Sequence, residues 1–162
     1  MRFSSILCTA IMIILCGFAH KSHAQDYMSL RSSKVNMRVG PGKMFPILWQ
    51  YRRRGLPLKI LDTHKDWVQL EDEDGESGWI YTKLLSTTRT AMTIADDVVL
   101  YRHPDNNSDI LATIMRHVVV VPTTCRPSWC YVSVKFNGDI VKGWIRKINI
   151  WGVDTHTVFD ED

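Results

Sequence analysis

The chain has 162 residues, of which 45% are hydrophobic and 23% charged, and its formal net charge is +3. This composition is ordinary for a globular protein, so long disordered and fibrous chains are excluded. The charge is too small for a dedicated polyanion binder, whose basic surface raises the isoelectric point of the domain above about 9.

The first 24 residues have the pattern of a secretory signal peptide. A positive start at Arg2 is followed by an apolar stretch at residues 6–16 and by small residues at Ser22 and Ala24. This order is typical of an export signal with cleavage after Ala24. The apolar stretch is shorter than the about 20 residues of a membrane-spanning helix. We therefore expect a periplasmic or secreted protein, with a retained N-terminal anchor as the alternative.

Cleavage would change the balance of charge. Residues 25–162 keep 18 basic and 17 acidic side chains, so the net charge falls to +1. A nearly neutral chain has little attraction for phosphate backbones or anionic lipid. The sequence therefore predicts no nucleic-acid partner and no stable membrane insertion after cleavage.

Two cysteines, Cys125 and Cys130, remain in the exported part of the chain. Four residues separate them, including Pro127, so a tight turn between two strands would place the cysteines opposite each other. Thiols of exported proteins are usually oxidised, and a bridge across so short a loop contributes about 2 kcal/mol. A redox C-x-x-C motif has only two spacer residues, and no zinc-ligand pair accompanies this one. We predict a structural disulfide and no metal site.

Strand patterns dominate the exported part. Short runs rich in β-forming residues occupy residues 35–39, 56–61, 67–70 and 79–81, and turn-forming residues separate them. No stretch keeps a helical period over a dozen residues. Several short strands at close spacing are typical of an all-β barrel or sandwich.

The same unit occurs twice along the chain. Residues 35–41 align with residues 98–104 at an offset of 63, Trp67 aligns with Trp129, and the Gly-Trp pair at 78–79 aligns with that at 143–144. Between the aligned Trp and Gly-Trp, each copy has a hairpin signal, Asp-Gly at 74–75 or Asn-Gly at 137–138. The sequence thus predicts a first domain at residues 25–88 and a second, divergent domain at residues 89–162.

These segments carry a family resemblance. The segment NMRVGPG at residues 36–42, Trp67, DGESGWI at residues 74–80 and the leucines at 84–85 resemble the bacterial Src homology 3 domain. The closing IWG at residues 150–152 resembles the end of exported two-copy members. The second copy departs from the motif with YRHPD at residues 101–105. The resemblance implies two small, strongly bent β-barrels and a binding role, often toward cell-wall polymer or peptide, without catalysis.

Four tryptophans recur in the two copies and are expected to form core or partly buried wall, because small barrels need large aromatic side chains for buried area. They are Trp67, Trp79, Trp129 and Trp144.

A candidate ligand surface lies only in the first copy. Trp49 and Tyr51 share one face of a strand by alternation, and Arg52, Arg53 and Arg54 follow directly. The aligned residues of the second copy are not aromatic. Aromatic rings beside arginines can form a shallow site for carbohydrate or an acidic peptide. Packing between the domains is an equally good interpretation.

Arg38 and the acidic segment at residues 71–76 complete the candidates. Arg38 precedes the Gly-Pro-Gly turn at residues 40–42 and either reaches a ligand carboxylate or, by default, pairs with the acids at residues 72–74. The acidic segment lacks the length and closing glutamate of a calcium loop, so we expect a solvent-facing hairpin tip.

The chain has no pattern of catalytic residues. The histidines of the exported part, at positions 64, 103, 117 and 156, have no metalloprotease spacing, and no G-x-S-x-G occurs. We therefore expect neither an enzyme nor a cofactor. The leading hypothesis is an exported binding module for peptidoglycan or its stem peptides, and the alternative is an adaptor that binds an envelope protein.

Overall fold

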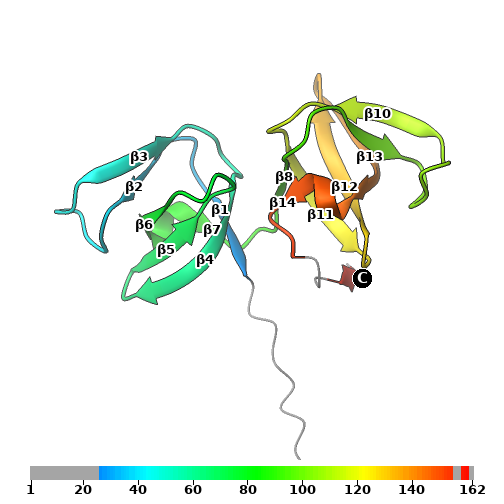
Figure 1. The fold of residues 1–162 in the computed structure, drawn as a ribbon. Coiled ribbons are helices and arrows are strands. Elements are labelled where there is room, and N and C mark those ends of the chain that lie inside the picture. Colours follow the sequence, from blue (N-terminus) through cyan, green and yellow to red (C-terminus); the bar gives the residue numbers. More distant parts are fainter. Residues whose placement is uncertain (1–25, 155–157, 161–162) are drawn as a thin grey trace, which may run out of the picture.

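The computed structural model describes residues 26–154 and 158–160, and these form two β-barrels joined by a single linker (Figure 1). The predicted signal peptide at residues 1–24 lies outside the described residues. Among the described residues, no helix has the length and apolar character needed to cross a membrane.

The first barrel is one antiparallel sheet with the strand order β3-β2-β6-β5-β4-β1-β7. A single turn of 3-10 helix, η1, joins its last two strands. Its elements are β1 (Tyr27–Leu30), β2 (Val35–Arg38), β3 (Ile47–Tyr51), β4 (Pro57–His64), β5 (Trp67–Glu71), β6 (Ser77–Tyr81), η1 (Thr82–Leu84) and β7 (Leu85–Ser86).

The second barrel has the order β10-β9-β13-β12-β11-β8-β14, and β15 adds to β11. Each of the first seven strands here is the counterpart of the strand seven places earlier in the chain. Its elements are β8 (Ala91–Thr93), β9 (Val98–Tyr101), β10 (Ile110–Ile114), β11 (Val119–Cys125), β12 (Trp129–Phe136), β13 (Asp139–Arg146), η2 (Lys147–Asn149), β14 (Ile150–Trp151) and β15 (Phe159–Asp160). The prediction of an all-β fold with two tandem small barrels is confirmed.

The glycine before the second tryptophan of each copy permits a close approach of two strands. A Cβ atom on Gly78 would lie 2.7 Å from the carbonyl oxygen of Arg38, and one on Gly143 would lie 2.7 Å from that of Tyr101. Real side chains do not tolerate such contacts with backbone, so only glycine fits. The sharp bend that closes each barrel therefore depends on this residue.

The predicted hairpin of the second copy is confirmed in detail. Phe136 pairs with Asp139, and the two turn residues, Asn137 and Gly138, have φ values of 49° and 97°. Two successive positive φ values define the type I′ turn, whose twist matches that of the flanking strands.

The predicted disulfide is present. Cys125 and Cys130 are opposite each other in the β11–β12 ladder and are bonded, with their Cα atoms 4.1 Å apart. The backbone N–H of Arg126 donates to the carbonyl of Trp129 at 2.8 Å and closes the turn between them. Both half-cystines are buried in the core of the second barrel.

The recurring tryptophans form the predicted partly buried wall. Trp129 is 8% exposed and contacts the ring of Tyr101 edge-on, with centroids 5.5 Å apart. The other three are half-buried. In the first barrel, Trp67 packs against Tyr81 at 5.6 Å. These rings add apolar area that a barrel of this size needs.

The two barrels share buried side chains at their junction. Met92 belongs to β8 of the second sheet, but it is 1% exposed and packs in the core of the first barrel. Tyr27 of β1 contacts Trp151 of β14 edge-on, with centroids 5.5 Å apart. A Cβ atom on Gly152 would lie 2.8 Å from that of Pro57. The barrels are therefore packed together along this seam.

Candidate functional site

The hairpin of β2 and β3 extends from the first barrel, and we call residues 35–51 the arm. Its loop is held by internal hydrogen bonds, including one from the N–H of Val39 to the carbonyl of Pro46 at 3.2 Å. A Cβ atom on Gly40 would lie 2.6 Å from the ring of Phe45. The first glycine of the Gly-Pro-Gly turn is thus needed so that the Phe45 ring can cover it.

Arg38 stabilises this loop. Its Nη1 donates a hydrogen bond of 2.7 Å to the carbonyl of Phe45. The default expectation of an ion pair with the acids at residues 72–74 was wrong, since within the described part of the chain no such pair is found. The bulge between β2 and β3 brings the start of β3 back toward Arg38, and this places a carbonyl within its reach.

Trp49 is the most exposed aromatic side chain of the arm. It is 49% exposed, and its indole Nε1 donates to Oε2 of Glu76 at 3.4 Å. This long contact orients the ring toward the β5–β6 hairpin and leaves half of the side chain accessible. The expectation that Trp49 presents a stacking surface remains a proposal, and the exposure is consistent with it.

Tyr51 lies on the same face of β3 but is half-buried. Its hydroxyl donates to Oδ2 of Asp72 at 2.7 Å, and its ring packs against the first core. Burial, followed by this hydrogen bond and the charge of Asp72, strongly raises the pKa of the Tyr51 hydroxyl. Tyr51 therefore remains a neutral donor and ties the arm to the acidic hairpin.

Asp72 differs from its predicted role. It is 7% exposed, and its Oδ1 accepts the N–H groups of Asp74 at 3.2 Å and Glu76 at 2.9 Å. The expectation of a wholly solvent-facing acidic tip was wrong at this residue. A carboxylate that accepts backbone N–H groups two and four residues later shapes the turn and can be buried, because its bonding capacity is filled.

The three arginines after β3 have different surroundings. Arg52 donates to Oε1 of Gln50 at 3.3 Å, and both Arg52 and Arg54 are exposed. Arg53 extends across the seam and donates from Nη1 to the carbonyl of His117 in the second barrel. The structure thus separates Arg53, which joins the barrels, from its two neighbours on the surface of the first.

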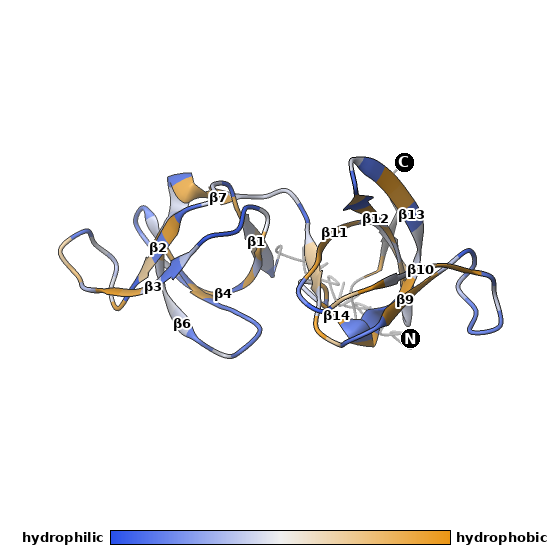
Figure 2. Cartoon of the chain, turned by 90° about the horizontal axis from the view of Figure 1, so that it is seen from above, coloured by the Kyte–Doolittle hydropathy of each residue, from blue (hydrophilic) through white to orange (hydrophobic). Residues whose placement is uncertain are grey.

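Apolar side chains crowd the outer part of the arm. Five large ones besides Trp49 are more than 40% exposed: Val39, Met44, Phe45, Ile47 and Leu48. Figure 2 shows hydrophobic colour along the start of β3. An exposed apolar cluster on a barrel of this size is a typical interaction surface. Sequence analysis did not single out this cluster, because exposure of apolar strand residues cannot be recognised from the residue pattern alone.

The corresponding arm of the second barrel is built differently. Its loop is held by an ion pair between Nε of Arg102 and Oδ2 of Asp109 at 3.1 Å. Ala112 stands where the first copy has Trp49, and Ile114, which is 6% exposed, stands in place of Tyr51. The aromatic part of the candidate site therefore belongs to the first barrel.

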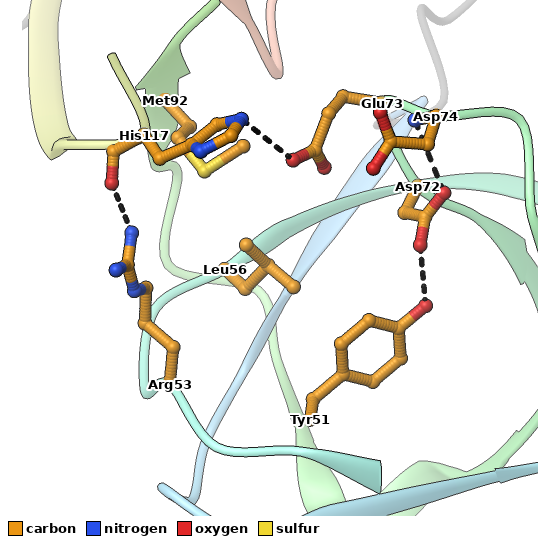
Figure 3. Close-up of a pocket in the computed structure, with 8 residues that line it drawn as sticks. All are labelled: Tyr51, Arg53, Leu56, Asp72, Glu73, Asp74, Met92 and His117. Atoms are coloured by element: carbon orange, nitrogen blue, oxygen red, sulfur yellow. Dashed lines mark hydrogen bonds and ion pairs between the residues drawn. The ribbon is translucent and has the colours of Figure 1, made fainter. Parts of the chain in front are cut away.

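A cavity of about 240 Å³ lies at the seam between the barrels (Figure 3). Its lining comes from the end of β3, the β5–β6 hairpin and two segments of the second barrel. The lining residues are Tyr51, Arg53, Leu56, Asp72, Glu73, Asp74, Met92 and His117. Sequence analysis did not bring these residues together, because Met92 and His117 lie in the other copy.

A histidine and a carboxylate face each other across this cavity. Nε2 of His117 lies 3.8 Å from Oε1 of Glu73 and accepts from Nε of Arg116 at 3.1 Å. Burial is the largest cause that raises the pKa of Glu73, and the charges of Asp72 and Asp74 raise it further. Among the described residues, no group of three or more His, Cys, Asp or Glu side chains could hold a metal ion.

Two bent barrels of identical strand order, with an exposed arm on the first, define a tandem small-barrel protein. The chain belongs to the bacterial SH3 domain family, which it matches twice, at residues 31–87 and 95–152. This match confirms the resemblance drawn from the sequence motifs.

The chain is similar to longer proteins. It is 30% identical over 91 residues to a protein of Bacillus subtilis (strain 168) named as an N-acetylmuramoyl-L-alanine amidase, YrvJ, and the match covers 54% of this chain but 17% of that protein. Among solved structures, NlpC2 from Trichomonas vaginalis matches with a TM-score of 0.34 and 13% identity over 79% of this chain and 48% of that chain. An NlpC/P60 family protein from Bacillus cereus ATCC 10987 matches with a TM-score of 0.34 and 14% identity. That match covers 77% of this chain and 55% of the other.

Proposed function

We propose that this protein is a non-catalytic binding module of the cell envelope that recognises peptidoglycan or its stem peptides through the arm of the first barrel. Membership of the bacterial SH3 domain family and the similarity to a protein named as a cell-wall amidase support the polymer as ligand. An exported, periplasmic or secreted location follows from the same proposal.

The half-exposed ring of Trp49 is the observation that carries the proposal. The exposed Arg52 and Arg54 follow it three and five residues later in the chain, and Arg52 bonds to Gln50 of the same strand. An accessible indole can stack on a sugar ring, and arginine forms charge-assisted hydrogen bonds with the carboxylates of a stem peptide. Arg38 would act indirectly, by fixing the loop through Phe45.

Binding without catalysis is part of the proposal. The longer relatives of the chain include a protein named as an amidase, of which this chain matches 17%. The candidate surface joins aromatic, basic and apolar groups, and none of its side chains is arranged as a nucleophile with a general base. Release of muropeptides from purified sacculi by this chain alone would contradict the proposal.

Co-sedimentation with purified sacculi is the direct test. We expect the protein to pellet with sacculi and Trp49→Ala to weaken binding at least fivefold. Phe136→Ala is a matched control, because Phe136 is also an exposed aromatic residue, 65% exposed at the β12–β13 turn of the second barrel. A protein that stays in the supernatant, or equal binding by both variants, would overturn the proposal.

A second candidate is an adaptor that binds an envelope protein. The exposed apolar side chains around Met44 and Phe45 favour it, since such clusters are common in protein interfaces. This function predicts recovery of one partner from envelope extracts, loss of that partner with Met44→Ser, and no affinity for bare sacculi. Sacculus binding that survives Met44→Ser would favour the polymer instead.

A further inference from the structure

The seam cavity has opposite charges on its two sides. Arg53 and His117 stand on one side in Figure 3, and Glu73 and Asp74 stand on the other, with Leu56 between them. The basic groups come from the segment after β3 and the turn before β11, and the acidic groups come from the β5–β6 hairpin. Both barrels are needed to complete this arrangement.

The base of the cavity is apolar. Leu56 is 7% exposed and Met92 is 1% exposed, and the ring of Tyr51 adds a third apolar wall. A volume of about 240 Å³ is below the roughly 300–1,000 Å³ of pockets for drug-sized molecules. The size therefore suits one or two amino-acid residues with a small side chain.

The charged groups retain capacity to bind a ligand. A guanidinium has five N–H donors, and the hydrogen bond from Arg53 to the carbonyl of His117 uses one of them. The 3.8 Å between His117 and Glu73 exceeds a hydrogen bond, so the imidazole does not occupy the Glu73 carboxylate as a donor. Burial raises the pKa of Glu73, a backbone hydrogen bond lowers it in part, and the nearby acids raise it further. An added cation would stabilise its charged form.

We propose that this cavity binds a small zwitterion, namely a free amino acid or a free dipeptide. The ammonium group lies toward Glu73 and Asp74, the carboxylate accepts from Arg53, and the side chain rests on Leu56. This site is separate from the surface around Trp49. It rests on the proposed function only for the source of the ligand, which would be a fragment released from a stem peptide.

Methyl NMR of the purified protein, labelled with ¹³C at the methionine methyl groups, tests the proposal. Alanyl-alanine is the probe, in both the D,D and the L,L form. We expect the Met92 methyl signal to shift and saturate with a Kd on the order of 1 mM. The signal of Met44, which is 98% exposed on the arm, should stay in place. Preference for the D,D form supports a cell-wall source, and preference for the L,L form supports ordinary peptides.

Blocked ligands and charge variants test the role of the two charges. Alanyl-alanine acetylated at its amino group, or amidated at its carboxyl group, should bind at least tenfold more weakly. Glu73→Gln and Arg53→Gln should each weaken binding by about tenfold, whereas the exposed controls Asp139→Asn and Lys142→Gln should not. The blocked ligands leave the protein unchanged, so they test the need for both charged termini even if Arg53→Gln disturbs the packing at the seam.

Either of two results would overturn the inference: an unmoved Met92 signal at 50 mM alanyl-alanine, or equal binding of the blocked and unblocked forms. If the protein does not bind sacculi but binds alanyl-alanine saturably, the proposed function is contradicted and the ligand site in the cavity is supported. If it binds sacculi and the Met92 signal does not respond, the proposed function is supported and the ligand site is contradicted.

Discussion

The hydroxyl of Tyr51 donates a 2.7 Å hydrogen bond to Oδ2 of the buried Asp72. This bond connects β3 to the turn that carries Glu73 and Asp74, so it fixes the arm and one side of the seam cavity relative to each other. The structure thus gives a structural role to a residue that the sequence suggested as a ligand contact.

Removing that hydroxyl should destabilise the protein. Tyr51→Phe leaves Asp72 buried with one hydrogen bond fewer, and we expect the free energy of unfolding to fall by about 1–3 kcal/mol in urea titrations. Tyr131→Phe is the control, because Tyr131 is half-buried and its ring packs on Trp144 in the second barrel. Its effect should stay within about 0.5 kcal/mol. Equal losses for the two variants would contradict this role of Asp72.

Met92 should stabilise the barrel to which its strand does not belong. Met92→Ala removes a fully buried side chain from the first core and should cost about 2–5 kcal/mol. Amide exchange measured by NMR should accelerate at Leu30 and Leu58 of the first barrel. Met115→Ala is the control, since Met115 is 72% exposed in the same copy. Exchange that accelerates only in the second barrel would show that the cores are independent.

Glu73 should make stability depend on pH. Its pKa in the folded protein lies above its usual value of 4.5, so the folded state holds the proton more tightly than the unfolded state. The resulting stability is fully present below pH 4.5 and is lost as the pH rises through the folded pKa. Glu73→Gln should therefore gain stability relative to the parent at pH 7 and little at pH 4. Asp139→Asn, at an exposed turn, should show no such difference, and a larger gain at pH 4 would contradict the sign.

The disulfide should be fully formed in protein recovered from the envelope. Thiol titration of unfolded protein that comprises residues 25–162 should find no free thiol, because Cys125 and Cys130 are bonded. Replacing both with serine should lower the free energy of unfolding by more than the about 2 kcal/mol expected for closure of a short loop, because the two hydroxyl groups would be buried in the core. Free thiols at Cys125 and Cys130 in protein recovered from the envelope would contradict both the bond and the oxidising compartment.

Local features were predictable from the sequence. The Asn-Gly turn at 137–138, the glycines at 78 and 143 and the pairing of Cys125 with Cys130 each follow from the conformational needs of one or two neighbouring residues. The repeat extended these predictions to the whole fold. Arg38 could not be placed in this way, because its partner is a backbone carbonyl that only the loop geometry brings near.

The seam could not be predicted, because its contacts join residues that no short-range pattern relates. His117 has a positive φ of 62°, and its N–H donates to the carbonyl of Thr93 at 2.7 Å. These two features direct the turn toward the first barrel. Neither of them can be recognised from the positions of the histidines in the sequence. Asp72 was misread for a similar reason, since its burial depends on Tyr51, whose strand lies about twenty residues earlier in the chain.

The position of Met92 limits how the two barrels can be separated or moved into another polypeptide. A cut in the linker before β8 would leave the first barrel with a hole in its core and the second with an apolar side chain in water. The two copies share one strand order, but the buried Met92 means that neither can be exchanged or transplanted singly. The smallest piece that could be moved into another polypeptide is the pair.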